Sequence, residues 1–413
     1  MDKLLKPTLN ILRLLLGALF VFSGFVKCVD PIGGAIKIED YFMAWGMDVP
    51  FSVDIALSLL QNIIEFTVGY MLIFNVFMPA ATFIALIFMC FFTPLTLYIV
   101  IANPVSDCGC FGEAVKLSNG ATFVKNIIFL IVAIIVFVFR SRFVNRLSLW
   151  RNVAIFTIGI LVAFMISVIG ISNEPLIDFR PYAVGTDIRA SMQIPENAPL
   201  TEYKTTFILE RNGERREFDE NNYPYNDSTW IFIDTKTEII SEGYVPAITD
   251  FTFTDRNGEI LTDEILDSTE PIYLIISPQL EYIEEQQVMR IAEIQNFMYE
   301  QNIRMYVATA SSGAAQSQFE NVAQMGFDFL SADETMLKTI MRCNGGLLCI
   351  QNGVVIAKYH IDHLPHLSAL SNPLATYLSD LEDSRVKLSI VSIALAIGIL
   401  ILLLYKKHKR NSK

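Results

Sequence analysis

The sequence predicts a helical bundle embedded in a membrane and joined to an α/β domain outside it. Two observations lead to this fold class. The chain is 53% hydrophobic, with a mean hydropathy of +0.43, which is too apolar for an ordinary soluble protein. Charge is also uneven, because residues 1–172 carry 11 basic and 9 acidic residues, whereas residues 173–384 carry 13 and 34. So acidic a region excludes nucleic acid as a partner.

Six stretches are apolar and long enough to cross a membrane, whose hydrocarbon core of about 30 Å requires roughly 20 helical residues. The sequence therefore predicts a bundle of about five spans within residues 1–172 and one C-terminal span within 385–413. The first stretch is expected to be retained, because no small-residue cleavage site follows it. The expected spans are about 9–27, 54–76, 79–101, 122–140, 152–171 and 387–405.

Basic residues, which mark the cytoplasmic ends of membrane spans, indicate the orientation. They gather near the N-terminus, in residues 140–152 and in the tail 406–413. All three positions agree with a bacterial inner-membrane protein that has six spans and both termini in the cytoplasm. The expected periplasmic parts are the loops 27–53 and 102–121 and the large region 172–386.

The periplasmic region divides into two predicted parts. Residues 173–244 form a β-rich segment, in which "TTFILERNGERREF" places an Asn212-Gly213 hairpin turn between two strands. Residues 245–384 show the order βαβαββα, which is that of a thioredoxin-like domain. Its expected elements are strand 271–277, helix 281–300, strand 303–310, helices 314–325 and 334–341, and a hairpin of strands 347–350 and 354–360.

The loop between the third and fourth spans carries "SDCGCFGE" (106–113), the main candidate for chemistry. Cys108 and Cys110 face an oxidising compartment, where thiol–disulfide chemistry is expected. Gly109 permits the bend that a disulfide between them requires. Asp107 and Glu113 are expected to raise the thiol pKa values. The pair is interpreted as redox-active, as a structural staple or as a metal site, although the position of all four histidines at residue 360 or later argues against metal.

Cys28 and Glu65 are two further catalytic candidates. Cys28 lies at the outer end of the first span, where it can staple to the CGC loop, resolve a mixed disulfide or simply pack against a helix. Glu65 lies near the middle of the second span, where a charge costs on the order of 2.5–3.5 kcal/mol, so it is expected to be neutral or paired. Glu65 has two interpretations. It takes part in a proton relay or in quinone contact, or it makes an interhelical hydrogen bond that only fixes packing, with Asn62 one turn away. A quinone is the one cofactor suggested, and no metal is predicted.

Three stretches carry a resemblance to a known family: "GALFVFSGFVKCVDPIG" (17–33), "QNIIEFTVGYML" (61–72) and "CGCFG" (108–112). Together they resemble the DoxX-like membrane proteins, and most of all the branch typified by MauE, the methylamine-utilisation protein. The resemblance covers about residues 8–172. It implies a small helical membrane bundle associated with electron or thiol metabolism. MauE itself is linked to the maturation of a disulfide-rich periplasmic dehydrogenase.

A second resemblance covers about residues 245–370. "VPAITDFTFTDRNGEILT" is similar to the opening of peroxiredoxin- and TlpA-type thioredoxin domains. The active cysteine pair of that family should follow strand 271–277, where this chain reads "PQLEYIEE". The loop that should carry a cis-proline reads Cys343-Asn344-Gly345-Gly346. The resemblance thus implies a thioredoxin-like domain without CxxC, and its fusion to a MauE-like bundle resembles an arrangement seen in Bacteroides-like bacteria.

These features support two functions of different kinds. In the first, Cys108 and Cys110 relay oxidising equivalents to periplasmic proteins that contain thiols or disulfides, and the soluble domain holds the partner. In the second, the chain is a non-enzymatic scaffold, whose bundle is an anchor in the lipid bilayer and whose acidic domain docks partners. A transporter has only Glu65 and the proline of the third span in its favour, and the chain shows no inverted repeat.

Overall fold

The computed structural model describes residues 2–105, 108–145, 147–199, 202–211, 213–220, 222–225, 227–241 and 243–376. The chain divides into two compact units. The larger consists of Met1–Gly185 together with Thr252–Lys413, and the smaller is Thr186–Phe251. The sixth expected span, 387–405, lies outside the described residues.

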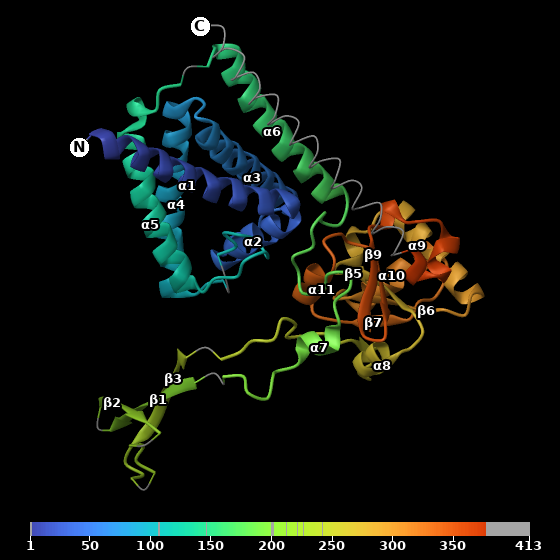
Figure 1. The fold of residues 1–413 in the computed structure, drawn as a ribbon. Helices are drawn as coiled ribbons and strands as arrows, with labels where there is room; N and C mark the ends of the chain where they lie inside the picture. The colour runs from blue at the N-terminus through green and yellow to red at the C-terminus, as the bar shows by residue number, and fades with distance from the viewer. Residues whose placement is uncertain are drawn as a thin grey trace. The chain divides into compact units, whose positions relative to one another are not determined.

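Five helices in the larger unit are long and apolar enough to cross a membrane (Figure 1). They confirm five apolar helices at the positions of the five predicted N-terminal spans, to within a few residues at each end. A short 3₁₀ turn, Arg140–Arg142, precedes the last of them. The spans are α1 (Asp2–Val29, of which Leu5–Val29 meets the criterion), α3 (Phe51–Phe74), α4 (Met78–Ala102), α5 (Asn119–Val138) and α6 (Leu149–Ser172).

Glycines allow helices α1 and α3 to approach each other so closely that their backbones are in contact. A Cβ atom on Gly69 would lie 2.5 Å from the backbone nitrogen of Val21, and one on Gly24 would collide with the backbone of Phe66. Small residues at such crossings are the usual means of close packing between helices in a membrane. The close crossing fixes the C-terminal part of α1 against the middle of α3, where the candidate site lies.

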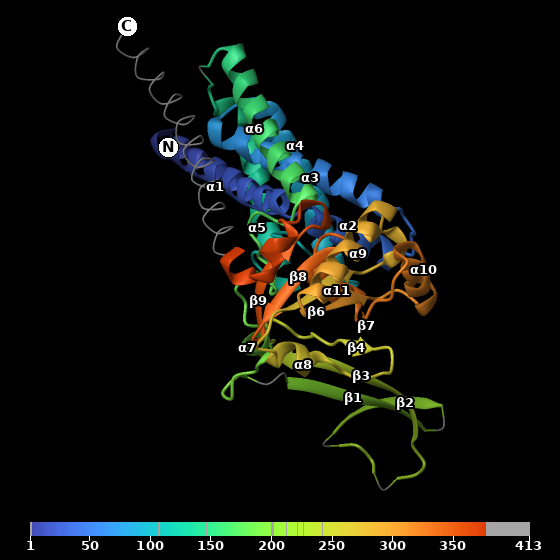
Figure 2. The ribbon, with the colours of Figure 1, turned by 90° about the vertical axis from the view of Figure 1, so that its right-hand side faces the viewer.

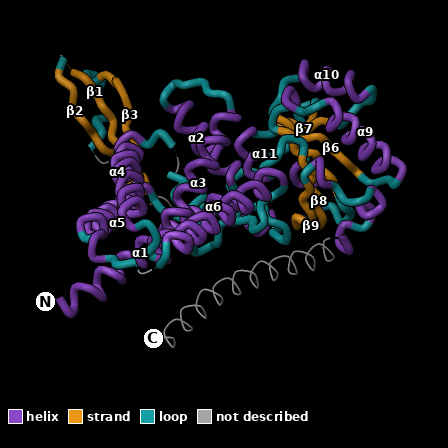
Figure 3. The backbone as a smooth tube through the Cα atoms, turned by 90° about the horizontal axis from the view of Figure 1, so that it is seen from above, coloured by secondary structure: helices purple, strands orange, loops and turns teal. Residues whose placement is uncertain are grey.

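The segment 27–53, expected as a loop, is largely helical. Helix α2 (Pro31–Ala44) begins immediately after α1 ends (Figure 3). Asp30 caps it, because its carboxylate accepts a hydrogen bond of 2.9 Å from the backbone N–H of Gly33. Proline at the first position of a helix loses no hydrogen bond, since that N–H has no partner within the helix. The Asp30-Pro31 pair therefore ends one helix and starts the next.

The rest of the larger unit, the α/β domain, contains a six-stranded mixed sheet (Figure 2). The central strand β5 (Ile272–Ser277) pairs in parallel with β6 and antiparallel with β8. All six residues of β5 are buried. In sheet order the strands are β4 (Thr254–Asp255), β7 (Phe329–Ser331), β6 (Arg304–Thr309), β5, β8 (Gly346–Gln351) and β9 (Val354–Tyr359).

Helices α9 and α10 pack on one face of this sheet. Alternate residues of β5 and β6, such as Tyr273, Ile275 and Val307, join Ile291 of α9 and Phe319 of α10 in one apolar core. All strands and helices expected between residues 271 and 360 are present, and β7 is an additional short strand. The helices are α8 (Thr262–Asp267), α9 (Glu285–Glu300), α10 (Gly313–Ala323) and α11 (Glu334–Ile340), with 3₁₀ turns at Leu280–Tyr282, Ile361–His363 and Leu367–Ser371.

The smaller unit contains a short helix and a three-stranded antiparallel sheet in the order β2-β1-β3. Gly213, at a φ of +81°, sits in the turn between the first two strands, where a residue without a Cβ is favoured. Asn212, predicted in the same turn, lies outside the described residues. The elements are α7 (Ile188–Met192), β1 (Glu202–Arg211), β2 (Glu214–Asp219) and β3 (Ile231–Ser241).

Candidate functional site

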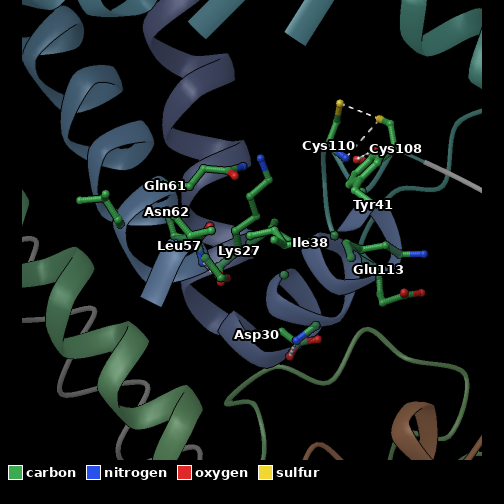
Figure 4. A pocket seen from close by; sticks show the side chains of 18 of the residues that line it. Lys27, Asp30, Ile38, Tyr41, Leu57, Gln61, Asn62, Cys108, Cys110 and Glu113 are labelled. Atoms are coloured by element: carbon green, nitrogen blue, oxygen red, sulfur yellow. Dashed lines mark hydrogen bonds between the residues drawn. The ribbon is translucent and has the colours of Figure 1, made fainter. Parts of the chain in front are cut away.

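A pocket of about 370 Å³ lies in the larger unit, at the end of the bundle where α1 meets α2 (Figure 4). The last turn of α1, one face of α2, the first half of α3 and the middle of α4 form its walls. The CGC loop, Cys108–Gly109–Cys110, forms a further wall. Most of the surface that lines the pocket is apolar, as is usual for a pocket that binds a small molecule. Two of the four predicted catalytic residues, Cys108 and Cys110, thus line it.

The CGC loop brings its two thiols together. The Sγ atoms of Cys108 and Cys110 lie 2.7 Å apart, and both cysteines are free (Figure 4). Gly109 makes the bend possible with a φ of +63°, in the left-handed region that favours glycine. The hydroxyl of Ser23 donates a hydrogen bond of 2.6 Å to the carbonyl oxygen of Cys110 and so ties the loop to α1. The bend predicted at Gly109 is confirmed.

The pKa values of the two thiols are shifted in opposite directions. The pKa of Cys110 is lowered to about 6, first by the hydrogen bond from the Cys108 thiol and then, against its burial, by the positive charges of Lys125 and Lys27. The same hydrogen bond and burial raise the pKa of Cys108, which is the donor. The expectation that carboxylates raise both values is wrong for Cys110. Glu113 pairs with Lys116 at 3.0 Å, and Asp107 lies outside the described residues.

Glu65 is paired, as expected for a carboxylate in a membrane span. Its partner is Lys27, whose Nζ lies 2.8 Å from Oε2 of Glu65, and the side chains are only 9% and 10% exposed. Asn62 donates a hydrogen bond of 3.0 Å to the carbonyl oxygen of Lys27. Lys27 itself lines the pocket, and its charge acts on both cysteines. The pair therefore places a cation next to the thiols without leaving a carboxylate or an ammonium unpaired in the membrane.

Sequence reasoning missed Lys27. Its position at the end of the first predicted span is apparent from the sequence, but a lysine there more often extends to the membrane surface. Lys27 instead turns inward, where its Nζ also lies 5.7 Å from the centroid of the Phe92 ring. A buried carboxylate in one predicted span and a lysine in another were the signal that could have found the pair.

Cys28 lies apart from the other candidates. Its side chain is completely buried and packs with Phe66 and Ala163, in the region where α1, α3 and α6 meet. Among the described residues it is not part of the pocket lining. The structure therefore joins Cys108, Cys110 and, through Lys27, Glu65, whereas Cys28 faces a different side of α1.

Arg342, from the loop before β8, also lines the pocket. Its Nε lies 3.0 Å from Oδ2 of Asp30, and a second guanidinium nitrogen lies 2.9 Å from the same oxygen. Burial raises the pKa of Asp30, but the charges of Arg342 and Arg180 more than offset this, so the pKa lies below its usual range. A nearby pair, Lys338 with Glu39 at 3.1 Å, also joins the α/β domain to α2. The α/β domain therefore closes one side of the pocket.

A second buried ion cluster lies next to this contact. Arg180 pairs with Glu174 and, at 2.6 Å, with Asp178, and Lys358 of β9 lies 2.9 Å from Asp178. The Arg180 and Lys358 charges hold the pKa of Asp178 below its usual range despite its burial. Because each charge has opposite partners, the cluster serves to join the segment after α6 to the sheet. Among the described residues, no group of His, Cys, Asp and Glu could hold a metal ion.

Two stretches of the chain match known families. Residues 5–139 match the family described as methylamine utilisation protein MauE. Residues 203–242, which contain most of the β2-β1-β3 sheet, match a domain of unknown function, DUF8463. No curated protein matches the chain. Residues 5–139, with α1 to α5 and the CGC loop, therefore form a MauE-family domain within a membrane protein.

Proposed function

We propose that this chain is a thiol–disulfide relay of the bacterial inner membrane, in which Cys108 and Cys110 oxidise thiol-containing proteins in the periplasm. The observation that carries the proposal is the geometry of the pair, whose Sγ atoms lie 2.7 Å apart. The hydrogen bond from the Cys108 thiol and the charges of Lys125 and Lys27 lower the pKa of Cys110 to about 6. A thiol with such a pKa is largely ionised at neutral pH, and the thiolate is both the nucleophile and the better leaving group. A cysteine that forms only a structural disulfide does not require a lowered pKa.

The exchange begins with the Cys108–Cys110 pair as a disulfide. A substrate thiolate attacks the Cys108 sulfur, the Cys108–Cys110 bond breaks, and its electron pair leaves on Cys110, the more acidic thiol. The second thiolate of the substrate then attacks the substrate sulfur that is bonded to Cys108, which forms the substrate disulfide and releases Cys108 as a thiolate. The substrate loses two electrons and two protons and becomes a disulfide, while the pair gains them and becomes two thiols.

The α/β domain is assigned the role of holding the substrate protein. We propose a thioredoxin-like fold for it, on the basis of its strand and helix order, and a periplasmic location, together with a sixth span and both termini in the cytoplasm. Arg342, which directly precedes the loop Cys343-Asn344-Gly345-Gly346 where a thioredoxin-like domain should carry a cis-proline, contacts Asp30 at the rim of the pocket. The domain is thereby held next to the thiol pair, although it contains no CxxC of its own.

Trapping of mixed disulfides tests the relay. In membranes from cells that express Cys110→Ser, the Cys108 thiolate can still attack the disulfide of an oxidised substrate. The mixed disulfide on Cys108 is expected to accumulate, because Cys110 is missing and cannot attack Cys108 to displace the substrate. Cys108→Ser should trap far less, since Cys110 is the leaving group. Full labelling of both thiols by a maleimide under all growth conditions, with no mixed disulfide in either variant, would contradict the proposal.

The acidity of residues 173–384 favours a second candidate, a scaffold that docks envelope proteins without redox chemistry. Cysteine substitution separates the two functions. If the chain is a relay, its partners should include proteins joined to it by disulfides, and the Cys108→Ser/Cys110→Ser double variant should lose them. A scaffold would keep the same crosslinked partners in that variant.

A further inference from the structure

The pocket beside the thiol pair has the features of a binding site for a quinone. We propose that a membrane quinone occupies it and reoxidises Cys108 and Cys110. This inference rests on the proposed relay, for which it names the electron acceptor. It is argued from the walls of the pocket, from its polar groups and from its opening.

The walls fit a flat, apolar ring. Phe88, Phe91 and Phe92 of α4 line one side, and Leu57 and Ile64 of α3 line another. At about 370 Å³ the pocket falls within the range of small-molecule sites, roughly 300–1,000 Å³. Aromatic faces stack favourably on planar rings, so the side formed by α4 suits a quinone head group better than a flexible acyl chain.

Hydrogen-bond donors converge at one end of the pocket. Lys27 and Gln61 line it (Figure 4). Asn62 also lines it, but its amide N–H groups already donate to the carbonyl oxygen of Lys27 and to the hydroxyl of Ser58. A lysine ammonium carries three N–H donors. Among the described residues, Lys27 uses one of them in a hydrogen bond, to Glu65 at 2.8 Å. The two carbonyl oxygens of a quinone accept hydrogen bonds, and negative charge grows on them during reduction. A nearby ammonium stabilises that charge.

The pocket opens toward the outer surface of the bundle within the membrane-spanning helices. Leu60 of α3 and Phe91 of α4, which both line the pocket, are 58% and 60% exposed. In a chain that crosses a bilayer, such apolar side chains face lipid. A molecule dissolved in the membrane can therefore enter sideways, whereas a water-soluble oxidant would have to approach past the α/β domain and Arg342.

The reaction balances without a further reagent. The Cys108 and Cys110 thiols lose two electrons and two protons and form one S–S bond. The quinone gains two electrons and two protons on its oxygens and leaves as a hydroquinone. Both cysteines line the same pocket as the donors, so no separate carrier is needed between them. The relay is thereby returned to its disulfide form for the next substrate.

Binding of decylubiquinone to the full chain in lipid nanodiscs tests this inference. Trp45 lines the pocket, and two other tryptophans lie elsewhere, so quenching of Trp45 fluorescence reports occupancy. The measurement is made in the Cys108→Ser/Cys110→Ser variant, so that it does not depend on the relay. Saturable quenching is expected, and it should disappear in Trp45→Phe.

A pair of matched variants separates binding from partition into lipid. Ile38→Phe/Leu57→Phe narrows the pocket and is expected to weaken binding by about tenfold or more, equivalent to about 1.4 kcal/mol. Ile128→Phe/Ile131→Phe makes the same changes on the exposed face of α5, outside the pocket lining, and should leave binding unchanged. Equal quenching in both variants, or quenching that never saturates, would overturn the quinone site. Neither result would contradict the relay, which disulfide trapping tests separately.

Discussion

Cys108 and Cys110 in the membrane bundle and Cys343 and Cys349 in the α/β domain have opposite surroundings. The first two share a loop beside Lys27 and Lys125, and the pKa of Cys110 falls to about 6. Burial raises the pKa of Cys349 to about 12 in the middle of the sheet. Burial and the neighbouring Glu174 carboxylate likewise raise the pKa of Cys343.

This difference lies in the environment and not in the residue type. The α/β domain holds cysteines where a thiolate would be costly, as in an ordinary protein core. In the bundle, a thiolate on Cys110 is stabilised by the hydrogen bond from the Cys108 thiol and by nearby cations. Thiol chemistry in this chain is therefore expected in the membrane domain, and the α/β domain is expected to act through contacts. Three experiments can break or sharpen that contrast.

The largest expected effect is on substrate oxidation. Cys108→Ser and Cys110→Ser should each abolish disulfide formation in the periplasmic substrate, because a dithiol is needed for two-electron exchange. Cys343→Ser and Cys349→Ser should leave it close to the wild-type rate, since neither thiol ionises near neutral pH. The substrate's redox state is read by alkylation and gel shift in cells that express each variant. A loss of function in Cys343→Ser at normal protein levels would break the contrast.

A smaller effect is expected at the contact between the two regions. Arg342→Ala leaves the buried Asp30 carboxylate without its guanidinium, and removing one partner of a buried ion pair costs about 3–5 kcal/mol. We expect lower thermal stability of the chain in nanodiscs and faster cleavage of the α/β domain by added protease.

Arg215→Ala is the matched control. Arg215 pairs with Glu210 at 2.9 Å on the exposed sheet of the smaller unit, where such a pair is worth ~0–1 kcal/mol. Equal changes in the two variants would show that the Arg342 contact does not hold the α/β domain to the bundle.

Much of this fold follows from local sequence signals. Apolar length gives the five described apolar helices, and short apolar runs give β5 and β6. Helix α2 was missed because Asp30-Pro31 and two glycines look like the start of a loop, although a capped helix can begin with the same residues. The thioredoxin-like fold, the DoxX likeness and the sixth span stay predictions.

The site was harder to predict than the fold. The CGC loop was found from its cysteines and its position between spans, and the need for a partner of Glu65 followed from its depth in the membrane. That the partner is Lys27 depends on the rotation of α1 against α3, which Gly24 and Gly69 set at close range. The Asp30–Arg342 pair joins residues 312 positions apart, and no local pattern records such a contact.

Alkylation of the unmutated chain gives the most direct test of the central claim, that the CGC loop holds a thiol with a lowered pKa. The reduced full chain is treated with iodoacetamide at a series of pH values, and modification of each cysteine is quantified by mass spectrometry. Since alkylation follows the thiolate, the rate at Cys110 is expected to rise through a midpoint near pH 6 and to be nearly constant above pH 7. Cys343 and Cys349 should stay unmodified over the same range. A midpoint at Cys110 near 8.5, the value of an ordinary thiol, would contradict the account.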